Sequence, residues 1–136
     1  MSTRSATKMH VTEHFHFLLV EDELFAQVIC KHVIEQAGYS VDIASNSREA
    51  LALLQNNRYH LIFLDLGLPD IAGTELIKEL RNTMHLEIPI IAVSAFDSTS
   101  KKNECVEIGF DDFMEKPFDL EKFHDILTGF LVSSHE

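Results

Sequence analysis

The chain has 136 residues, of which 46% are hydrophobic, with only five glycines and three prolines. This length allows one domain with its own hydrophobic core, and the composition excludes a disordered chain. Twenty-two acidic against eleven basic side chains give a formal net charge of −11, so the chain should repel phosphate backbones and anionic lipid. We therefore expect no direct binding of nucleic acid and no membrane contact.

The cysteines and the N-terminal segment indicate the compartment. Cys30 and Cys105 lie far apart in no metal-binding spacing, and two thiols do not make a disulfide framework. No apolar run approaches the roughly 18 residues that span a bilayer. Residues 1–14 lack the apolar middle of a signal peptide. We predict a cytoplasmic location, with residues 1–14 as a flexible leader or linker.

The first apolar run, FHFLLV at 15–20, predicts a strand. Apolar residues at helical spacing follow it as far as Gly38: Phe25, Val28, Ile29, Val33 and Ala37. This strand-and-helix unit recurs along the chain. The later strands are predicted at 40–44, 60–65, 88–95 and 111–116, and the later helices from Asn46 or Ser47, at 73–82, at 101–108 and at 119–131.

The predicted strands are almost continuously apolar, without clean alternation of apolar and polar residues. This pattern is typical of a parallel sheet covered on both faces by helices. Five such strand-and-helix units in about 120 residues indicate a doubly wound open sheet. We predict an α/β fold with a doubly wound (βα)5 arrangement and a five-stranded parallel sheet.

Polar residues stand at the ends of the predicted strands. Glu21 and Asp22 follow the first strand, Asp65 ends the third, Ser94 ends the fourth and Lys116 ends the fifth. Open parallel sheets bind ligands at the carboxyl ends of their strands, near the point where strand order reverses. We therefore expect these five side chains to converge on one site.

Three carboxylates gathered in a cleft would repel one another unless a cation lay between them. Ligands that are all oxygen favour Mg²⁺ over zinc, with Mn²⁺ as an alternative. A divalent cation, the ammonium of Lys116 and the hydroxyl of Ser94 are groups that stabilise a transferring phosphoryl group. Asp65 would then be the nucleophile, because a carboxylate can attack phosphorus to give an acyl phosphate.

Four segments in this order carry a family resemblance: FLLVEDE at 17–23, LDLGLPDIAG at 64–73, SAF at 94–96 and GFDDFMEKPF at 109–118. Together they resemble the receiver domain of two-component response regulators. The resemblance covers residues 15–132 and leaves residues 133–136 as a C-terminal tail. It implies a flavodoxin-like three-layer sandwich.

The resemblance implies a role for each acidic residue. Asp65 matches the acceptor of a phosphoryl group from a phosphohistidine on a histidine kinase or histidine phosphotransfer domain. Glu21 and Asp22 match the acidic pair that holds Mg²⁺, together with Asp65 and the backbone carbonyl of Gly67. Glu21 stands where the family also uses aspartate, and we expect its longer side chain to preserve metal binding.

Three further residues match the family's phosphate-binding and switch positions. Ser94 matches the hydroxyl residue that hydrogen-bonds the phosphoryl group, and Lys116 matches the lysine that pairs with a phosphoryl oxygen. The peptide before Pro117 is commonly cis in the family. Phe113 matches the aromatic switch residue, with a phenylalanine where tyrosine is frequent. Its movement implies a change in the surface of the fourth helix, fifth strand and fifth helix.

Several functions remain open on these residues. A phosphorylatable switch is favoured over a receiver-like module that docks partners without phosphate, because all five strand-end groups are present. A phosphate-ester hydrolase is disfavoured because Gly67 replaces the second acid of a DxD pattern. We expect no conventional turnover enzyme, only a domain that assists its own phosphorylation and dephosphorylation. A free-standing receiver, a relay and the cytoplasmic receiver of a hybrid sensor kinase all fit, as does a homodimer through the switch surface.

Overall fold

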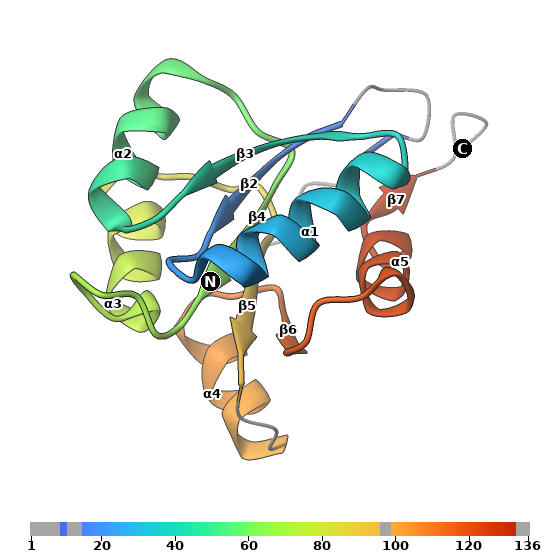
Figure 1. Ribbon diagram of the computed structural model, residues 1–136. Helices are drawn as coiled ribbons and strands as arrows, with labels where there is room; N and C mark the ends of the chain where they lie inside the picture. The colour runs from blue at the N-terminus through green and yellow to red at the C-terminus, as the bar shows by residue number, and fades with distance from the viewer. Residues whose placement is uncertain (1–8, 11–14, 96–98, 133–136) are drawn as a thin grey trace.

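Five parallel strands form the central sheet, in the spatial order β3-β2-β4-β5-β6 (Figure 1). The computed structural model describes residues 9–10, 15–95 and 99–132. The strands of this sheet are β2 (His16–Val20), β3 (Ser40–Ala44), β4 (Leu61–Asp65), β5 (Ile90–Ser94) and β6 (Asp112–Glu115). Every neighbouring pair is parallel. The predicted doubly wound α/β fold is therefore confirmed.

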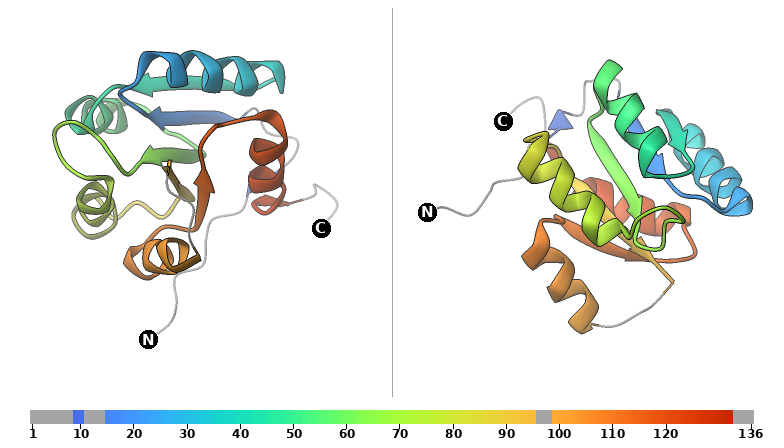
Figure 2. Two further views of the ribbon diagram at one scale, coloured as in Figure 1. Left: turned by 60° about the horizontal axis from the view of Figure 1, so that its bottom comes forward. Right: turned by 90° about the vertical axis from the view of Figure 1, so that its left-hand side faces the viewer.

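Helices cover both faces of this sheet (Figure 2). They are α1 (Leu24–Gln36), α2 (Ser47–Asn56), α3 (Gly73–Lys78), α4 (Thr99–Ile108) and α5 (Leu120–Thr128). Buried residues of α1 and α5 pack on one face, and those of α2, α3 and α4 pack on the other. The sheet is the middle layer of a three-layer sandwich. No helix in the described ranges has the length and apolar character needed to cross a membrane.

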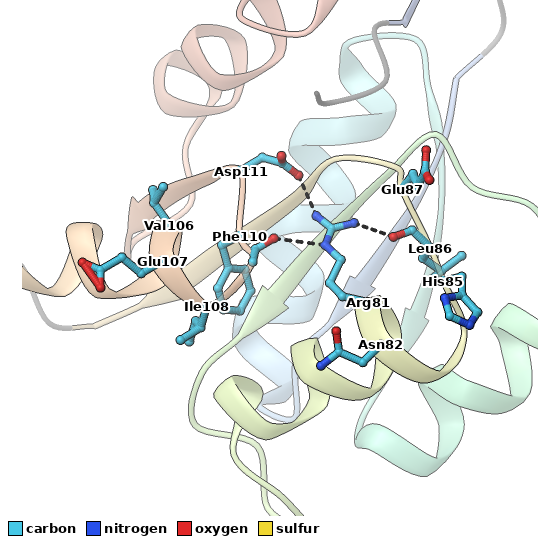
Figure 3. A pocket seen from close by; sticks show the side chains of 11 residues that line it. Arg81, Asn82, His85, Leu86, Glu87, Val106, Glu107, Ile108, Phe110 and Asp111 are labelled. Carbon is cyan, nitrogen blue, oxygen red and sulfur yellow. Dashed lines mark hydrogen bonds and ion pairs between the residues drawn. The ribbon is translucent and has the colours of Figure 1, made fainter. Parts of the chain in front are cut away.

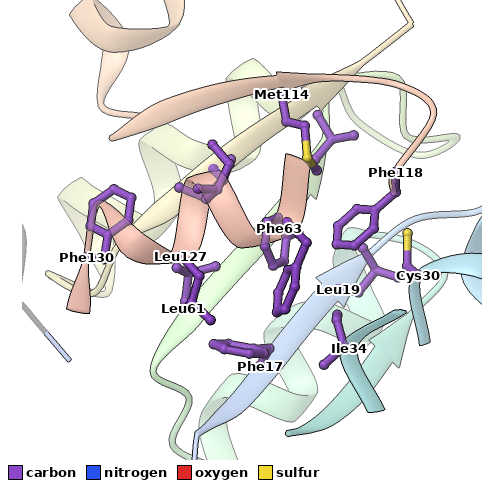
Figure 4. Close-up of a cluster of buried hydrophobic side chains, with 14 of the residues drawn as sticks. Phe17, Leu19, Cys30, Ile34, Leu61, Phe63, Met114, Phe118, Leu127 and Phe130 are labelled. Carbon is purple, nitrogen blue, oxygen red and sulfur yellow. The ribbon is translucent and has the colours of Figure 1, made fainter. Parts of the chain in front are cut away.

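Alternating strand residues fill two separate cores. In β2, Phe17 and Leu19 lie in the cluster beneath α1 and α5, whereas Leu18 and Val20 lie in the cluster on the opposite face. Figure 4 shows the first cluster, in which the rings of Phe17 and Phe63 meet edge to face with centroids 6.3 Å apart. Burial on both faces explains why the three inner strands, β2, β4 and β5, are almost continuously apolar, whereas the part-buried edge strands β3 and β6 also carry polar residues.

The third helix differs from the prediction. The periodicity predicts one helix over 73–82, but α3 ends at Lys78 and a π-helix, η1 (Glu79–Thr83), continues it. At the end of η1 the amide of Met84 donates to the carbonyl of Glu79 at 3.0 Å, which is the i to i−5 bond of a π-helix.

Arg81 in η1 ties together the segments that precede β5 and β6 (Figure 3). Its guanidinium donates to the carbonyls of Gly109 at 3.0 Å, Leu86 at 3.0 Å and Ile88 at 2.8 Å, and to the carboxylate of Asp111 at 2.8 Å. Arg81 borders a cavity of about 570 Å³ at the amino ends of β5 and β6. Gly109 and Asp111 lie 28 and 30 positions from Arg81, so the local apolar pattern cannot indicate these contacts of the π-helix.

The fifth helix is shorter than predicted. It ends at Thr128, before Gly129, and Phe130 then turns back into the core. Leu131–Val132 forms β7, which pairs in parallel with β1 (Met9–His10). Two residues of the predicted leader therefore take part in a small second sheet. The rest of residues 1–14 and the predicted tail, 133–136, lie outside the described residues.

Candidate functional site

The carboxyl ends of β2 and β4 lie side by side where the strand order reverses. The chain runs from β2 outward to β3 and then returns to β4 on the other side of β2. Open parallel sheets place ligand sites at this kind of switch point. Glu21 follows β2, and its amide donates to the carbonyl of Ala44 at 2.9 Å. Asp65 is the last residue of β4, so both acids flank the switch point.

Three carboxylates meet at this edge of the sheet. Oxygen atoms of Glu21, Asp22 and Asp65 all lie within 4.8 Å of one another. Glu21 is 2% exposed and Asp65 is 6% exposed, whereas Asp22 faces solvent. Carboxylate oxygens are the ligands that Mg²⁺ prefers, and one solvent-facing acid leaves a route of entry for the ion. The donor set therefore fits a hard divalent cation.

Lys116 lies between the two buried acids. Its Nζ is 2.9 Å from Oε1 of Glu21 and 3.1 Å from Oδ2 of Asp65. The peptide between Lys116 and Pro117 is cis, as the resemblance implies. Lys116 and Asp65 are separated by 51 positions in the sequence, so only the sheet brings them together. The structure thus brings together Glu21, Asp22, Asp65 and Lys116, four of the five side chains that were predicted to converge.

The charges of this group depend on one another. Burial raises the pKa of Glu21, although hydrogen bonds from Lys116 and from the amide of Glu23 oppose the rise. Burial alone lowers the pKa of Lys116, but its hydrogen bonds to Glu21 and Asp65 outweigh this effect and leave the pKa above its ordinary value. The lysine is thus held in its charged form as a counter-ion to the acids.

Two glycines shape the loop after β4. The amide of Gly67 donates to Oδ1 of Asp65 at 3.0 Å, which orients that carboxylate. Gly73 begins α3 against the start of the same loop, where a Cβ would come within 2.6 Å of the carbonyl oxygen of Asp65 and 2.8 Å of Cα of Leu66. Any side chain at this position would push β4 and α3 apart. This close packing explains the glycine that ends the LDLGLPDIAG segment.

Ser94 and Phe113 lie on the two strands beyond Asp65. Ser94 ends β5 and is 4% exposed, and its carbonyl accepts from the amide of Lys116 at 2.8 Å. The neighbouring Val93 is paired in register with Asp65. Phe113 is half-buried in β6, opposite Ala92, and packs against the core beneath α4. Phe96, at the end of the SAF segment, lies outside the described residues.

A mostly apolar cavity of about 340 Å³ opens beside the acids. Phe25, Ile29 and Cys30 of α1 form one wall, and Pro117 and Phe118 form another. Glu21, Asp65 and Lys116 are also part of its lining. The cavity therefore connects the charged site with an apolar surface on α1.

The sequence reasoning missed this surface of α1. Leu24, Phe25 and Val28 are 71%, 69% and 57% exposed, although the apolar periodicity alone suggests a buried helix. The buried positions are Cys30 and Ile34. A signal was available, because apolar residues in α1 cover more of the helix than one core-facing stripe can bury.

Comparisons with known sequences agree with the geometry. The family model of the response regulator receiver domain matches residues 17–128. The uncharacterized transcriptional regulatory protein YkoG of Bacillus subtilis is 36% identical over 110 residues, which are 81% of this chain and 48% of YkoG. The response regulator MprA of a Mycobacterium species is 35% identical over 105 residues, which are 77% of this chain and 45% of MprA. The chain spans about half the length of these curated relatives.

Solved structures show the same fold. The receiver domain of the Francisella response regulator 1452 is 32% identical, with a TM-score of 0.77 over 86% of this chain and 96% of that one. The chemotaxis response regulator CheY4 of Vibrio cholerae is 30% identical, with a TM-score of 0.79 over 88% of this chain and 100% of CheY4. From its sequence, its fold and these likenesses, the chain belongs to the response regulator receiver domain family.

Proposed function

We propose that this receiver domain accepts a phosphoryl group on Asp65 from a phosphohistidine of a histidine kinase or histidine phosphotransfer domain. The observation that carries the proposal is the position of Lys116, whose ammonium lies within 3.1 Å of Asp65 and 2.9 Å of Glu21 at the strand ends. A lysine beside a buried carboxylate and two further acids is suited to phosphoryl transfer, which depends on positioning and charge stabilisation.

In the proposed transfer, a carboxylate oxygen of Asp65 attacks phosphorus. An O–P bond forms while the N–P bond of the phosphohistidine breaks, and the imidazole nitrogen leaves with the electron pair. Lys116 pairs with one phosphoryl oxygen, and the hydroxyl of Ser94 donates to another. The amide of Gly67, which donates to Oδ1 of Asp65 at 3.0 Å, holds the attacking carboxylate in place.

The proposed metal ligands are the carboxylates of Glu21, Asp22 and Asp65 and the backbone carbonyl of Gly67. Their support is the set of carboxylate oxygens within 4.8 Å of one another. Mg²⁺ is the proposed ion and Mn²⁺ is an alternative, because both accept oxygen ligands. When bound, the ion supplies positive charge that neutralises the phosphoryl oxygens and the acids.

The proposed output is a change in the surface of α4, β6 and α5. Ser94 ends β5, and Phe113 lies on the neighbouring strand β6. A hydroxyl drawn toward the phosphoryl group would change the packing next to Phe113, and the ring would follow. Phosphorylation then biases a two-state surface because the phosphoryl group is bound better in one state than in the other. A downstream protein or a second copy of the chain would read that surface.

The partner that delivers phosphate must approach an acid that is only 6% exposed. Leu24, Phe25 and Val28 on α1 provide an exposed apolar surface, and Phe25 also lines the cavity next to Asp65. An apolar docking surface beside a charged cleft suits a protein donor better than a small phosphate ester. We propose this surface as the contact for the phosphohistidine-bearing partner.

The proposal is tested by incubating the chain with Mg²⁺ and acetyl phosphate and then measuring intact mass and mapping peptides. We expect a hydroxylamine-labile gain on Asp65 that requires the metal. It should be absent in Asp65→Asn and unchanged in Asp125→Asn, which alters an exposed acid on α5. A labile gain on another residue would overturn the acceptor assignment. With no gain and no response to beryllofluoride, a phosphate-independent docking module would become the better account.

A further inference from the structure

Asp70 lies outside the group of acids described above, on the loop between β4 and α3. Its carboxylate accepts hydrogen bonds from the amide of Ser47, at 3.1 Å to Oδ1 and 3.0 Å to Oδ2, and from the Ser47 hydroxyl. The amide of Arg48 donates to Oδ2 at 3.3 Å. These donors belong to the first turn of α2, so the loop after β4 is tied to a different helix.

The other anchors of this loop are internal to it or to the core. The amide of Gly73 donates to the carbonyl of Leu66 at 2.9 Å, which closes the loop at its base. Leu68 packs into the core beneath α2, α3 and α4. Between these anchors lies Gly67, the proposed carbonyl ligand of the metal. Asp70 adds a fixed connection from this loop to α2.

A second connection joins the start of α2 to the acidic pair. The side-chain amide of Gln27 donates to the carbonyl of Glu21 at 2.6 Å and to the hydroxyl of Ser45 at 3.1 Å. Ser45 is two residues before Ser47, which Asp70 holds. The segment 45–47 therefore bridges the two loops that carry the proposed metal ligands.

We propose that Asp70 is a positioning residue for the metal site, holding the loop of Asp65 and Gly67 at a fixed distance from Glu21 and Asp22 through the start of α2. This inference rests on the proposed function. Hydrogen bonds from Ser47 lower the pKa of Asp70 well below its ordinary range, so the connection stays charged at neutral pH. Without it the ligands remain but move relative to one another, and an ordered site has to be assembled at each binding event.

The test is a calorimetric titration of Mg²⁺ into the wild type and into Asp70→Ala. Residues that orient metal ligands without binding the metal themselves typically contribute about 10-fold to 100-fold in metal affinity. We expect a loss of about tenfold in Asp70→Ala, at the low end of this range, because Leu68 and Gly73 still anchor the loop. The matched control is Asn46→Ala. Asn46 caps the same helix through the amide of Glu49 at 2.8 Å, and its side chain is the N-cap of α2 without being part of the Asp70 connection. It should weaken α2 and leave the Mg²⁺ affinity unchanged.

A second variant keeps the test decisive if Asp70→Ala does not fold. Ser47→Ala removes only the hydroxyl bond to Asp70 and should cause a smaller loss of affinity in the same direction. Far-UV circular dichroism and urea unfolding report the stability of each variant separately. A wild type that binds no Mg²⁺ would overturn the proposed function itself. A wild type that binds, with unchanged affinity in both Asp70→Ala and Ser47→Ala, would overturn only the positioning role. Equal losses in Asp70→Ala and Asn46→Ala would assign the effect to helix stability and overturn it too.

Discussion

Replacing Lys116 by methionine removes the positive charge between two buried acids. The wild-type ammonium is 2.9 Å from Glu21 and 3.1 Å from Asp65. The substitution keeps the apolar part of the side chain but leaves two nearby carboxylates without their counter-ion. We predict that Lys116→Met folds with lower stability in the absence of divalent metal.

The structure sets the size of this effect. Removing one partner of a fully buried ion pair costs about 3–5 kcal/mol. The Lys116 side chain is 27% exposed, whereas those of Glu21 and Asp65 are 3% and 9% exposed. Solvent at the lysine screens part of the interaction, so we expect a loss of about 2 kcal/mol.

The assay is urea unfolding in EDTA, followed by far-UV circular dichroism because the chain has no tryptophan. For a domain of this size, a loss of about 2 kcal/mol lowers the urea midpoint by about 1 M. The control is Lys78→Met. Lys78 pairs with Glu75 at 3.3 Å with both side chains more than half exposed, so its loss should cost less than about 1 kcal/mol. An unchanged midpoint in Lys116→Met would refute the counter-ion argument.

The same variant carries a pH signature. The folded state raises the pKa of Glu21 above its unfolded value, so this group contributes stability at low pH that is lost as pH rises through the folded pKa. Lys116→Met removes a hydrogen bond that opposes the rise. The loss in free energy of unfolding of Lys116→Met relative to the wild type should therefore be smaller at about pH 5 than at about pH 8. Added Mg²⁺ should also narrow the deficit, because the cation replaces the lost charge. A deficit independent of pH and metal would contradict this account.

Three other changes test separate parts of the molecule. Arg81→Ala removes the guanidinium that pairs with the carboxylate of Asp111, which is 9% exposed, and should cost about 3–5 kcal/mol in urea unfolding. A loss below that of an exposed pair would count against this reasoning. Gly73→Ala places a Cβ 2.6 Å from the carbonyl oxygen of Asp65, so thermal unfolding should show a cost of about 1–3 kcal/mol, and an unchanged midpoint would mean that the loop adapts. Asp22→Asn should weaken Mg²⁺ binding in a calorimetric titration. An affinity equal to that of the wild type would mean that the ion binds at another site.

Much of the fold could be predicted because its signals are local. The inner strands β2, β4 and β5 are apolar runs that end at or just before a polar residue, and burial on both faces of a parallel sheet requires such runs. Helix starts also carry local signals, as at Asn46, whose side chain caps α2. The failures came where distant partners decide the geometry. The π-helix carries Arg81, whose guanidinium hydrogen-bonds to segments that follow η1 in the chain. In α1, the exposed apolar side chains have the spacing of core residues, so the sequence pattern does not distinguish them from buried ones.

The sequence alone determined which residues stand at the strand ends, since strand length and hydrophobicity place Glu21, Asp65, Ser94 and Lys116 there whatever the strand order. It also indicated a cation site with oxygen ligands, because several negative carboxylates close together need a positive counter-charge. Only the tertiary structure decided that Lys116 pairs with both Glu21 and Asp65, which depends on the order in which the strands assemble. It likewise decided that Asp70 binds the start of α2, a contact across 23 positions. No local pattern encodes such pairs, because the folded sheet, and not the spacing along the chain, sets the distance between them.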